Sequence, residues 1–190
     1  MDTHDAIARR TSVRSFKRTP LDRWAIERLI AAAVRAPNHK LTEPWRFIVL
    51  TGAARDAYAE VRRAHRAKKF ADNPDTPEAR KAVEKTWREH LDTPAFIFVL
   101  MSLAADPVRR EEDYGAVMMA IENLLIAAWA DGIGTWLRTG GIMDLPEVRA
   151  LAEAREDERI VGIISAGYLD GEPQPTARKK PLSELITWKE

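Results

Sequence analysis

Apolar positions along the chain follow two periods, and these periods predict helices and strands. Residues 24–34 carry apolar side chains at helical spacing, and Asp22 precedes them as an N-cap residue. The stretches 46–50, 95–103 and 159–169 are nearly continuous apolar runs. Runs of this length are typical of buried strands. We therefore expect one amphipathic helix followed by three strands that enter the core.

A second group of helices is predicted from composition. Residues 111–130 are apolar around more than half of the helix circumference, as in a core or subunit-interface helix. Residues 53–91 are rich in Ala, Arg, Lys and Glu and read as two exposed helices broken at 72–77. The apolar tail 172–190 is expected to dock on another surface, such as a second subunit. The shorter elements expected are a helix at 5–10, a strand within 132–141 and a helix at 146–152.

This order of elements predicts an α+β fold, with a small mixed central β-sheet flanked by helices and an extended C-terminal tail. We expect residues 1–190 to form a single domain. The chain has 190 residues, a net charge of +1 and no cysteine. That composition excludes disulfides and thiolate metal sites, and it argues against a nucleic-acid partner. No apolar stretch approaches the ~20 residues that span a bilayer, so a cytoplasmic protein with no membrane partner is expected.

The first candidate for chemistry is the sequence RRTSVRSF, residues 9–16. If this stretch is extended, its period of two places Arg10, Ser12 and Arg14 on one face. Two guanidinium groups and a hydroxyl on one face suit a phosphate. The alternative is a solvated basic turn.

The second candidate is the loop RAPNHKLTEPWRF, residues 35–47, which follows the first long helix. Arg35 and His39 flank a proline there. A histidine in such a loop is either a functional group or an ordinary surface residue, and Trp45 is expected in the core. The four histidines show no metal-ligand spacing, so no metal is expected, and His65 is read as a surface residue.

Two further stretches are ambiguous. In GIGTWLRTGG, a lone G-x-G is only a weak signal for a nucleotide site. Gly132 and Gly134 also suit a helix C-cap followed by a tight turn. The following Arg138–Gly141 segment adds donors and backbone that a ligand can approach closely. The basic run ARKKP, residues 177–181, is by itself a solvated surface run.

Taken together, these four stretches resemble the nitroreductase family of flavin oxidoreductases, and most closely its compact bacterial branch. RRTSVRSF resembles the family's R-x-S-x-R motif, and the loop at 35–47 resembles its A-P-S-x-x-N-x-Q-P-W loop. The resemblance covers residues 7–50 and 112–190 and leaves out 53–91. Asn38, Leu41 and Glu43 depart from the commoner loop, where Ser, Asn and Gln stand.

The resemblance implies an FMN site built by two subunits of a homodimer. Arg35 and His39 would come from the second subunit, and Arg178 or Lys179 would reach the phosphate. Residues 127–132 would lie near the nicotinamide cofactor. The FMN-binding residues implied are Arg10, Thr11, Ser12, Arg14, Arg35, His39, Leu137, Arg138, Thr139, Gly140, Gly141, Arg178 and Lys179.

The resemblance also implies the activity: hydride passes from NADPH or NADH through bound FMN to a small-molecule acceptor such as a nitroaromatic or a quinone. The chemistry would be flavin-centred, with no catalytic side chain. The helical segment 53–91 would cover the active site and select the substrate. The alternatives are another flavin reaction on the same fold, such as reductive dehalogenation or azoline oxidation, and a non-enzymatic FMN-binding protein.

Overall fold

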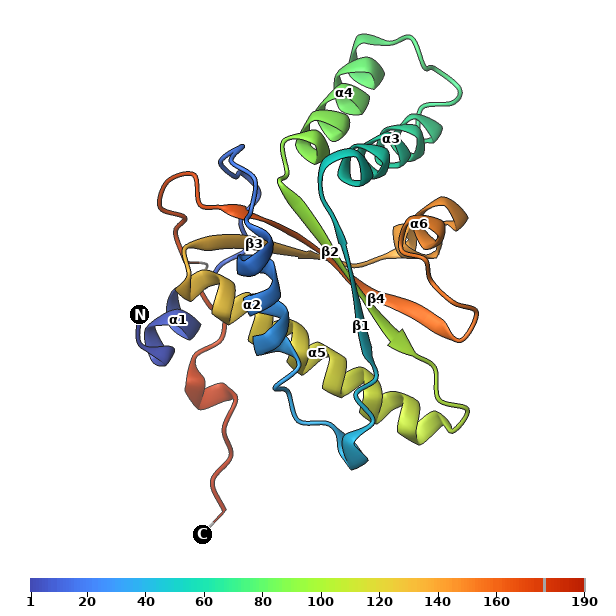
Figure 1. Cartoon of the computed structure of the whole chain (residues 1–190). Helices are drawn as coiled ribbons and strands as arrows, with labels where there is room; N and C mark the ends of the chain where they lie inside the picture. Colours follow the sequence, from blue (N-terminus) through green and yellow to red (C-terminus); the bar gives the residue numbers. More distant parts are fainter. Residues whose placement is uncertain (176, 190) are drawn as a thin grey trace.

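The protein is described by a computed structural model that covers residues 1–175 and 177–189. Its centre is a four-stranded sheet with helices on both faces (Figure 1). The strands lie in the order β1 (Trp45–Leu50), β2 (Ala95–Ser102), β4 (Glu158–Tyr168) and β3 (Ile133–Arg138). The described helices longer than one turn are α1 (Thr3–Arg9), α2 (Arg23–Ala33), α3 (Gly52–Lys68), α4 (Pro77–Leu91), α5 (Pro107–Ala130) and α6 (Pro146–Leu151). The expected α+β class and the expected order of elements are confirmed.

Strand β2 lies inside the sheet and accounts for the continuous apolar run at residues 95–103. Its odd-numbered residues from 95 to 101 belong to a core that also contains residues of α2 and α5. Its even-numbered residues from 96 to 100 belong to a second core that includes residues of α3 and α6. Because side chains alternate across a strand, a sheet buried on both faces needs apolar residues at every position.

The sheet differs from the prediction in strand direction. All three pairings between its four strands are antiparallel, and the parallel component is one isolated bridge between Ser12 and Thr135. The reason lies in α3 and α4, which pack together as a helical hairpin and return the chain to the end of the sheet that it had left (Figure 1). Leu50, the last residue of β1, therefore pairs with Phe96 at the start of β2.

The N-terminal segment lies along the strands β3 and β4. The backbone N–H of Val13 donates to the carbonyl of Thr135 at 2.9 Å, and that of Lys17 donates to the carbonyl of Tyr168 at 3.0 Å. This contact depends on Gly134, because a Cβ placed there would lie 2.9 Å from the Cβ of Val13. Gly134 therefore serves close packing, while Gly132, at φ +71°, ends α5 as the C-cap interpretation predicted.

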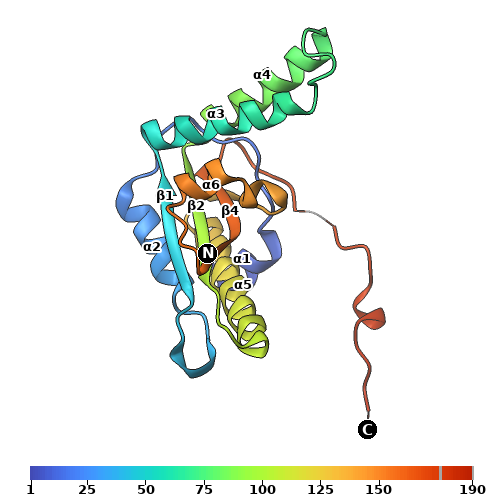
Figure 2. The ribbon, with the colours of Figure 1, turned by 90° about the vertical axis from the view of Figure 1, so that its right-hand side faces the viewer.

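The C-terminal tail leaves the body of the molecule. In both views the segment beyond β4 runs outward, and its short 3-10 turn lies apart from the sheet (Figures 1 and 2). Leu182, Leu185 and Trp188 are 69%, 63% and 83% exposed. The expected docking of this tail stays a prediction for an assembly of more than one chain. Among the residues described, no helix is long and apolar enough to cross a membrane.

Candidate active site

The segment after α1 has the extended, alternating form that the sequence predicted. Helix α1 ends at Arg9, and Thr11 and Val13 point into the protein whereas Ser12 and Arg14 are exposed. Arg10, Thr11 and Ser12 line a pocket of about 440 Å³. Arg178 of the tail lines the same pocket, and Lys179 does not. Residues separated by more than 160 positions thus meet where the resemblance places a phosphate.

Arg10 is held in this pocket by an acid on α5. Its Nε lies 3.2 Å from a carboxylate oxygen of Glu122, and its side chain is 19% exposed. A guanidinium has five N–H donors in a fixed plane, so this pair orients Arg10 and leaves other donors for a ligand. The pocket can accordingly hold an anion with one oriented guanidinium, a second from Arg178 and the hydroxyl of Ser12.

The middle of the site is a tryptophan with two arginines stacked on it. The guanidinium carbon of Arg14 lies 4.4 Å from the ring centroid of Trp136, and that of Arg138 lies 3.9 Å from it. A cation over an indole ring is attracted by the ring's negative face. Trp136 therefore places two positive charges beside the end of β3.

Buried polar groups hold the side chain of Arg138 in place. Its Nε donates to the hydroxyl of Ser165 at 3.1 Å, and its Nη1 lies 3.3 Å from Nε2 of His90. The Nδ1 of His90 donates to the carbonyl of Thr86 at 2.7 Å, since a carbonyl can only accept. Nε2 of a neutral His90 is then the acceptor for Arg138.

Burial sets the charges of this pair. Desolvation and the neighbouring charge of Arg138 lower the pKa of His90 to about 3. Desolvation lowers the pKa of Arg138 to about 10. At neutral pH the histidine is therefore uncharged and Arg138 remains a cation.

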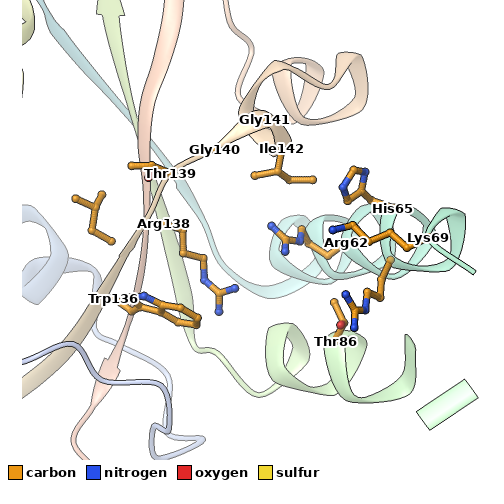
Figure 3. Close-up of a pocket in the computed structure, with 12 residues that line it drawn as sticks. Arg62, His65, Lys69, Thr86, Trp136, Arg138, Thr139, Gly140, Gly141 and Ile142 are labelled. Carbon is orange, nitrogen blue, oxygen red and sulfur yellow. The ribbon is translucent and has the colours of Figure 1, made fainter. Parts of the chain in front are cut away.

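A cavity of about 730 Å³ opens beyond the end of β3 (Figure 3). One wall is the segment from Trp136 to Ile142, which includes the predicted residues Leu137, Arg138, Thr139, Gly140 and Gly141. Gly140 has φ +118°, a conformation that favours glycine and exposes its backbone. The opposite wall is helix α3, with Thr86 of α4.

The helix wall contains residues that the sequence reasoning missed. Arg62, His65, Arg66 and Lys69 of α3 and its C-cap line the cavity. Reading His65 as a surface residue was wrong: it is half-buried in the cavity wall, because α3 packs across the end of the sheet. A signal was present, since these four basic residues stand at i, i+3, i+4 and i+7 and share one face of a helix.

Arg35 and His39 do not join the rest of the site within one chain. His39 Nδ1 lies 2.8 Å from a carboxylate oxygen of Glu112 on α5, and neither Arg35 nor His39 lines the two pockets described above. Their loop lies at the opposite end of the molecule from α3 and α4 (Figures 1 and 2). Leu41 and Glu43 have φ of +52° and +42° there, so the two substituted positions carry backbone strain.

Comparison with known proteins shows the family of this chain. The sequence model of the nitroreductase family matches residues 7–168. The chain belongs to the nitroreductase family. Among its nitroreductase relatives is YfhC of Bacillus subtilis, whose name assigns it to the NAD(P)H nitroreductases; it is 31% identical over 96% of this chain and 92% of its own length.

Solved nitroreductase structures share the fold. A nitroreductase-like protein from Bacillus cereus superposes with a TM-score of 0.84 at 30% identity, covering 100% of this chain and 97% of its own. The FMN and NADPH-dependent nitroreductase NfnB from Sphigopyxis sp. strain HMH superposes with a TM-score of 0.77 at 20% identity, covering 100% of both chains. The fold predicted from the four motifs is thus confirmed.

Proposed function

We propose that this nitroreductase-family protein is an FMN-dependent oxidoreductase that uses NADPH or NADH to reduce a nitroaromatic, a quinone or a similar acceptor. The observation that carries the proposal is that Arg10, Ser12 and Arg178 line one pocket near the start of β3. The donor-rich segment Leu137–Gly141 lies at the other end of β3, where it lines the larger cavity. The family match and the FMN-dependent relative of the same fold support it.

The residues present fit FMN. Ser12 is bridged to Thr135, and the chain from Thr135 to Thr139, just past the end of β3, covers roughly 13 Å at the usual rise per residue of a strand. A cofactor with a phosphate at one end and a ring at the other matches this spacing. We assign the phosphate to Arg10, Thr11, Ser12 and Arg178, and the ring to Arg14 and to residues 137–141.

Bound FMN supplies the redox chemistry, taking a hydride from the nicotinamide and passing electrons to the acceptor. The chain supplies position and charge. Arg14 and Arg138, both stacked on Trp136, would favour negative charge on a ring beside them. His90 and Ser165 hold Arg138 in that orientation. No catalytic side chain is proposed.

We further propose that the working form is a homodimer in the cytoplasm. Arg35 and His39 line neither of the two pockets in their own chain, and their loop lies at the opposite end of the molecule from α3 and α4, so a second copy would bring them to the flavin. The exposed apolar tail supplies a surface for that copy. The α3–α4 hairpin, which is one wall of the cavity at the end of β3, would cover the active site in this single domain.

The assignment of Arg10 is tested by its alanine variant. Losing a charge-assisted pair to the phosphate should weaken FMN binding by about 2–3 kcal/mol. The loss of affinity is measured as the FMN retained after purification, from the flavin absorbance at about 450 nm. Arg9→Ala is the matched control, because Arg9 is exposed in the last turn of α1 and does not line the pocket. Equal FMN retention in both variants would refute the assignment.

Assays with NADPH and a nitroaromatic distinguish the enzyme from the alternatives. Reduction of the nitro group supports the proposal. Flavin that stays oxidised under excess NADPH and NADH would favour a non-enzymatic FMN-binding protein. Flavin that is reduced but does not pass electrons to nitroaromatics or quinones would favour another reaction on the same fold.

A further inference from the structure

One face of α3 concentrates positive charge toward the cavity. Arg62, Arg66 and the C-cap residue Lys69 line it, and Arg138 faces them from β3 (Figure 3). His65 lies among them and is kept neutral near pH 7, since burial and the charges of its neighbours lower its pKa. The cations therefore repel one another across a shared cavity, which costs free energy unless a negative group lies between them.

The chain itself compensates this charge only weakly. Within residues 1–175 and 177–189, no salt bridge engages Arg62, Arg66 or Lys69. The nearest acid on the facing helix α6 is Glu147, which lies 3.9 Å from Lys68. The negative charge of Glu89 on α4 raises the pKa of Arg138, against the larger lowering by burial. The Nε of Arg66 and the Nδ1 of His65 are buried and find no hydrogen-bond partner in the described part of the chain.

We infer that the basic face of α3 (Arg62, His65, Arg66 and Lys69) binds the phosphate groups of the reducing nicotinamide dinucleotide and makes NADPH the preferred donor. The inference rests on the proposed function, because the dinucleotide must reach the flavin. The cavity offers that route, since its other wall is the segment from Leu137 to Gly141, which we assign to the flavin ring.

The length of the basic face favours phosphates over a single carboxylate. From Arg62 to Lys69 it extends roughly 10 Å along the helix axis, at 1.5 Å per residue. One carboxylate engages one or two neighbouring cations. NADPH carries a pyrophosphate and a separate 2′-phosphate, so it can engage cations distributed along two turns, and arginine is well suited to phosphate oxygens.

The test compares Arg66→Gln and Lys69→Gln with the control Arg63→Gln. Arg63 is on the same helix, but it is 3.5 Å from Glu60 and stacks on Trp87 instead of lining the cavity. Calorimetry would measure binding of 2′,5′-ADP, the doubly phosphorylated half of NADPH, and of 5′-AMP. We expect each cavity variant to raise the Kd for 2′,5′-ADP about tenfold, as for a lost charge-assisted hydrogen bond, and the control to leave it unchanged.

The kinetic arm should show the same pattern. The KM for NADPH should rise about tenfold in the cavity variants, while the KM for neutral 4-nitrobenzamide and the FMN content stay at wild-type values. Three results would each overturn the inference: 2′,5′-ADP binding no tighter than 5′-AMP, equal behaviour of Arg66→Gln and Arg63→Gln, or loss of FMN in the cavity variants. Because nucleotide binding needs no electron transfer, it decides the inference even if the proposed reaction is not observed.

Discussion

At the scale of single residues, the site depends on a buried histidine that the sequence left unassigned. His90 is 1% exposed, stacks on Phe96 with ring centroids 5.6 Å apart, and accepts from Arg138. A neutral imidazole can donate to the Thr86 carbonyl through one ring nitrogen and accept from a guanidinium through the other. Arg138 was predicted from the family motif, but its partner could not be, because His90 lies 48 positions earlier in a segment without that motif.

The buried histidine predicts how stability depends on pH. Its pKa is about 3 in the folded protein and 6.5 ordinarily, so below pH 6.5 the unfolded chain binds a proton that the native state refuses. Stability should therefore be complete above pH 6.5 and fall as the pH decreases toward 3. In denaturant titrations between pH 7 and pH 5, wild type should lose on the order of 2 kcal/mol more than His90→Gln. His4→Gln, at an exposed site, should behave as wild type; an identical loss in all three proteins would contradict this account.

At the scale of elements, strand β3 and the extended segment 10–17 form the site together. The donors of Leu137–Gly141 lie at the end of the strand, and the segment carries Arg10, Thr11 and Ser12, which we propose bind the phosphate together with Arg178 of the tail. Their register is set by the Ser12–Thr135 bridge and by the glycine that lets Val13 approach. The alternation of residues 10–14 was readable from the sequence, whereas the neighbour of this segment was not, because that contact joins residues 123 positions apart.

Gly134→Ala tests this junction. The added Cβ would lie 2.9 Å from atoms of Val13 and Leu169, so the segment must shift, at a cost of about 1–3 kcal/mol for overpacking. Because the shift moves Ser12, FMN retention should fall as well. Thermal unfolding and flavin absorbance measure the two effects. Gly115→Ala is the control: nothing lies within 4 Å of its Cβ in helix α5, so it should be neutral or stabilising by up to about 1 kcal/mol. A stable Gly134→Ala protein with full FMN would show that the junction is adaptable.

At the scale of the whole molecule, one chain holds most of the proposed site but not all of it. The residues of one chain line both the pocket proposed for the phosphate and the cavity at the end of β3, whereas the loop with Arg35 and His39 lies at the opposite end of the molecule from α3 and α4. The end of the tail, with Leu182, Leu185 and Trp188, also lies apart from the body, which leaves large apolar side chains in water. Both features are accounted for by the proposed homodimer, in which each chain supplies its loop and its tail to the other.

Charged substitutions in the tail test the dimer. Leu185→Glu combined with Trp188→Glu should weaken association by at least tenfold in Kd, since two apolar anchors would no longer be buried. Light scattering after size-exclusion chromatography, run over a range of concentrations, measures it. Trp24→Glu is the control, because Trp24 is 57% exposed on α2 and no role in association is assigned to it. A monomeric wild type, or a double variant as dimeric as the control, would rule the tail out as an interface.

The sequence by itself determined the helices and strands, the α+β class and the alternation in RRTSVRSF, because these follow from local periodicity. It also carried the family motifs, which point to Arg138 and its neighbours. The tertiary structure alone decided that the strands run antiparallel, that Arg178 and not Lys179 lines the pocket of Arg10, and that His90 is buried. It also decided that the basic face of α3 lies across a cavity from the end of β3. These features depend on contacts between distant segments, and such contacts are set by the packing of the whole chain.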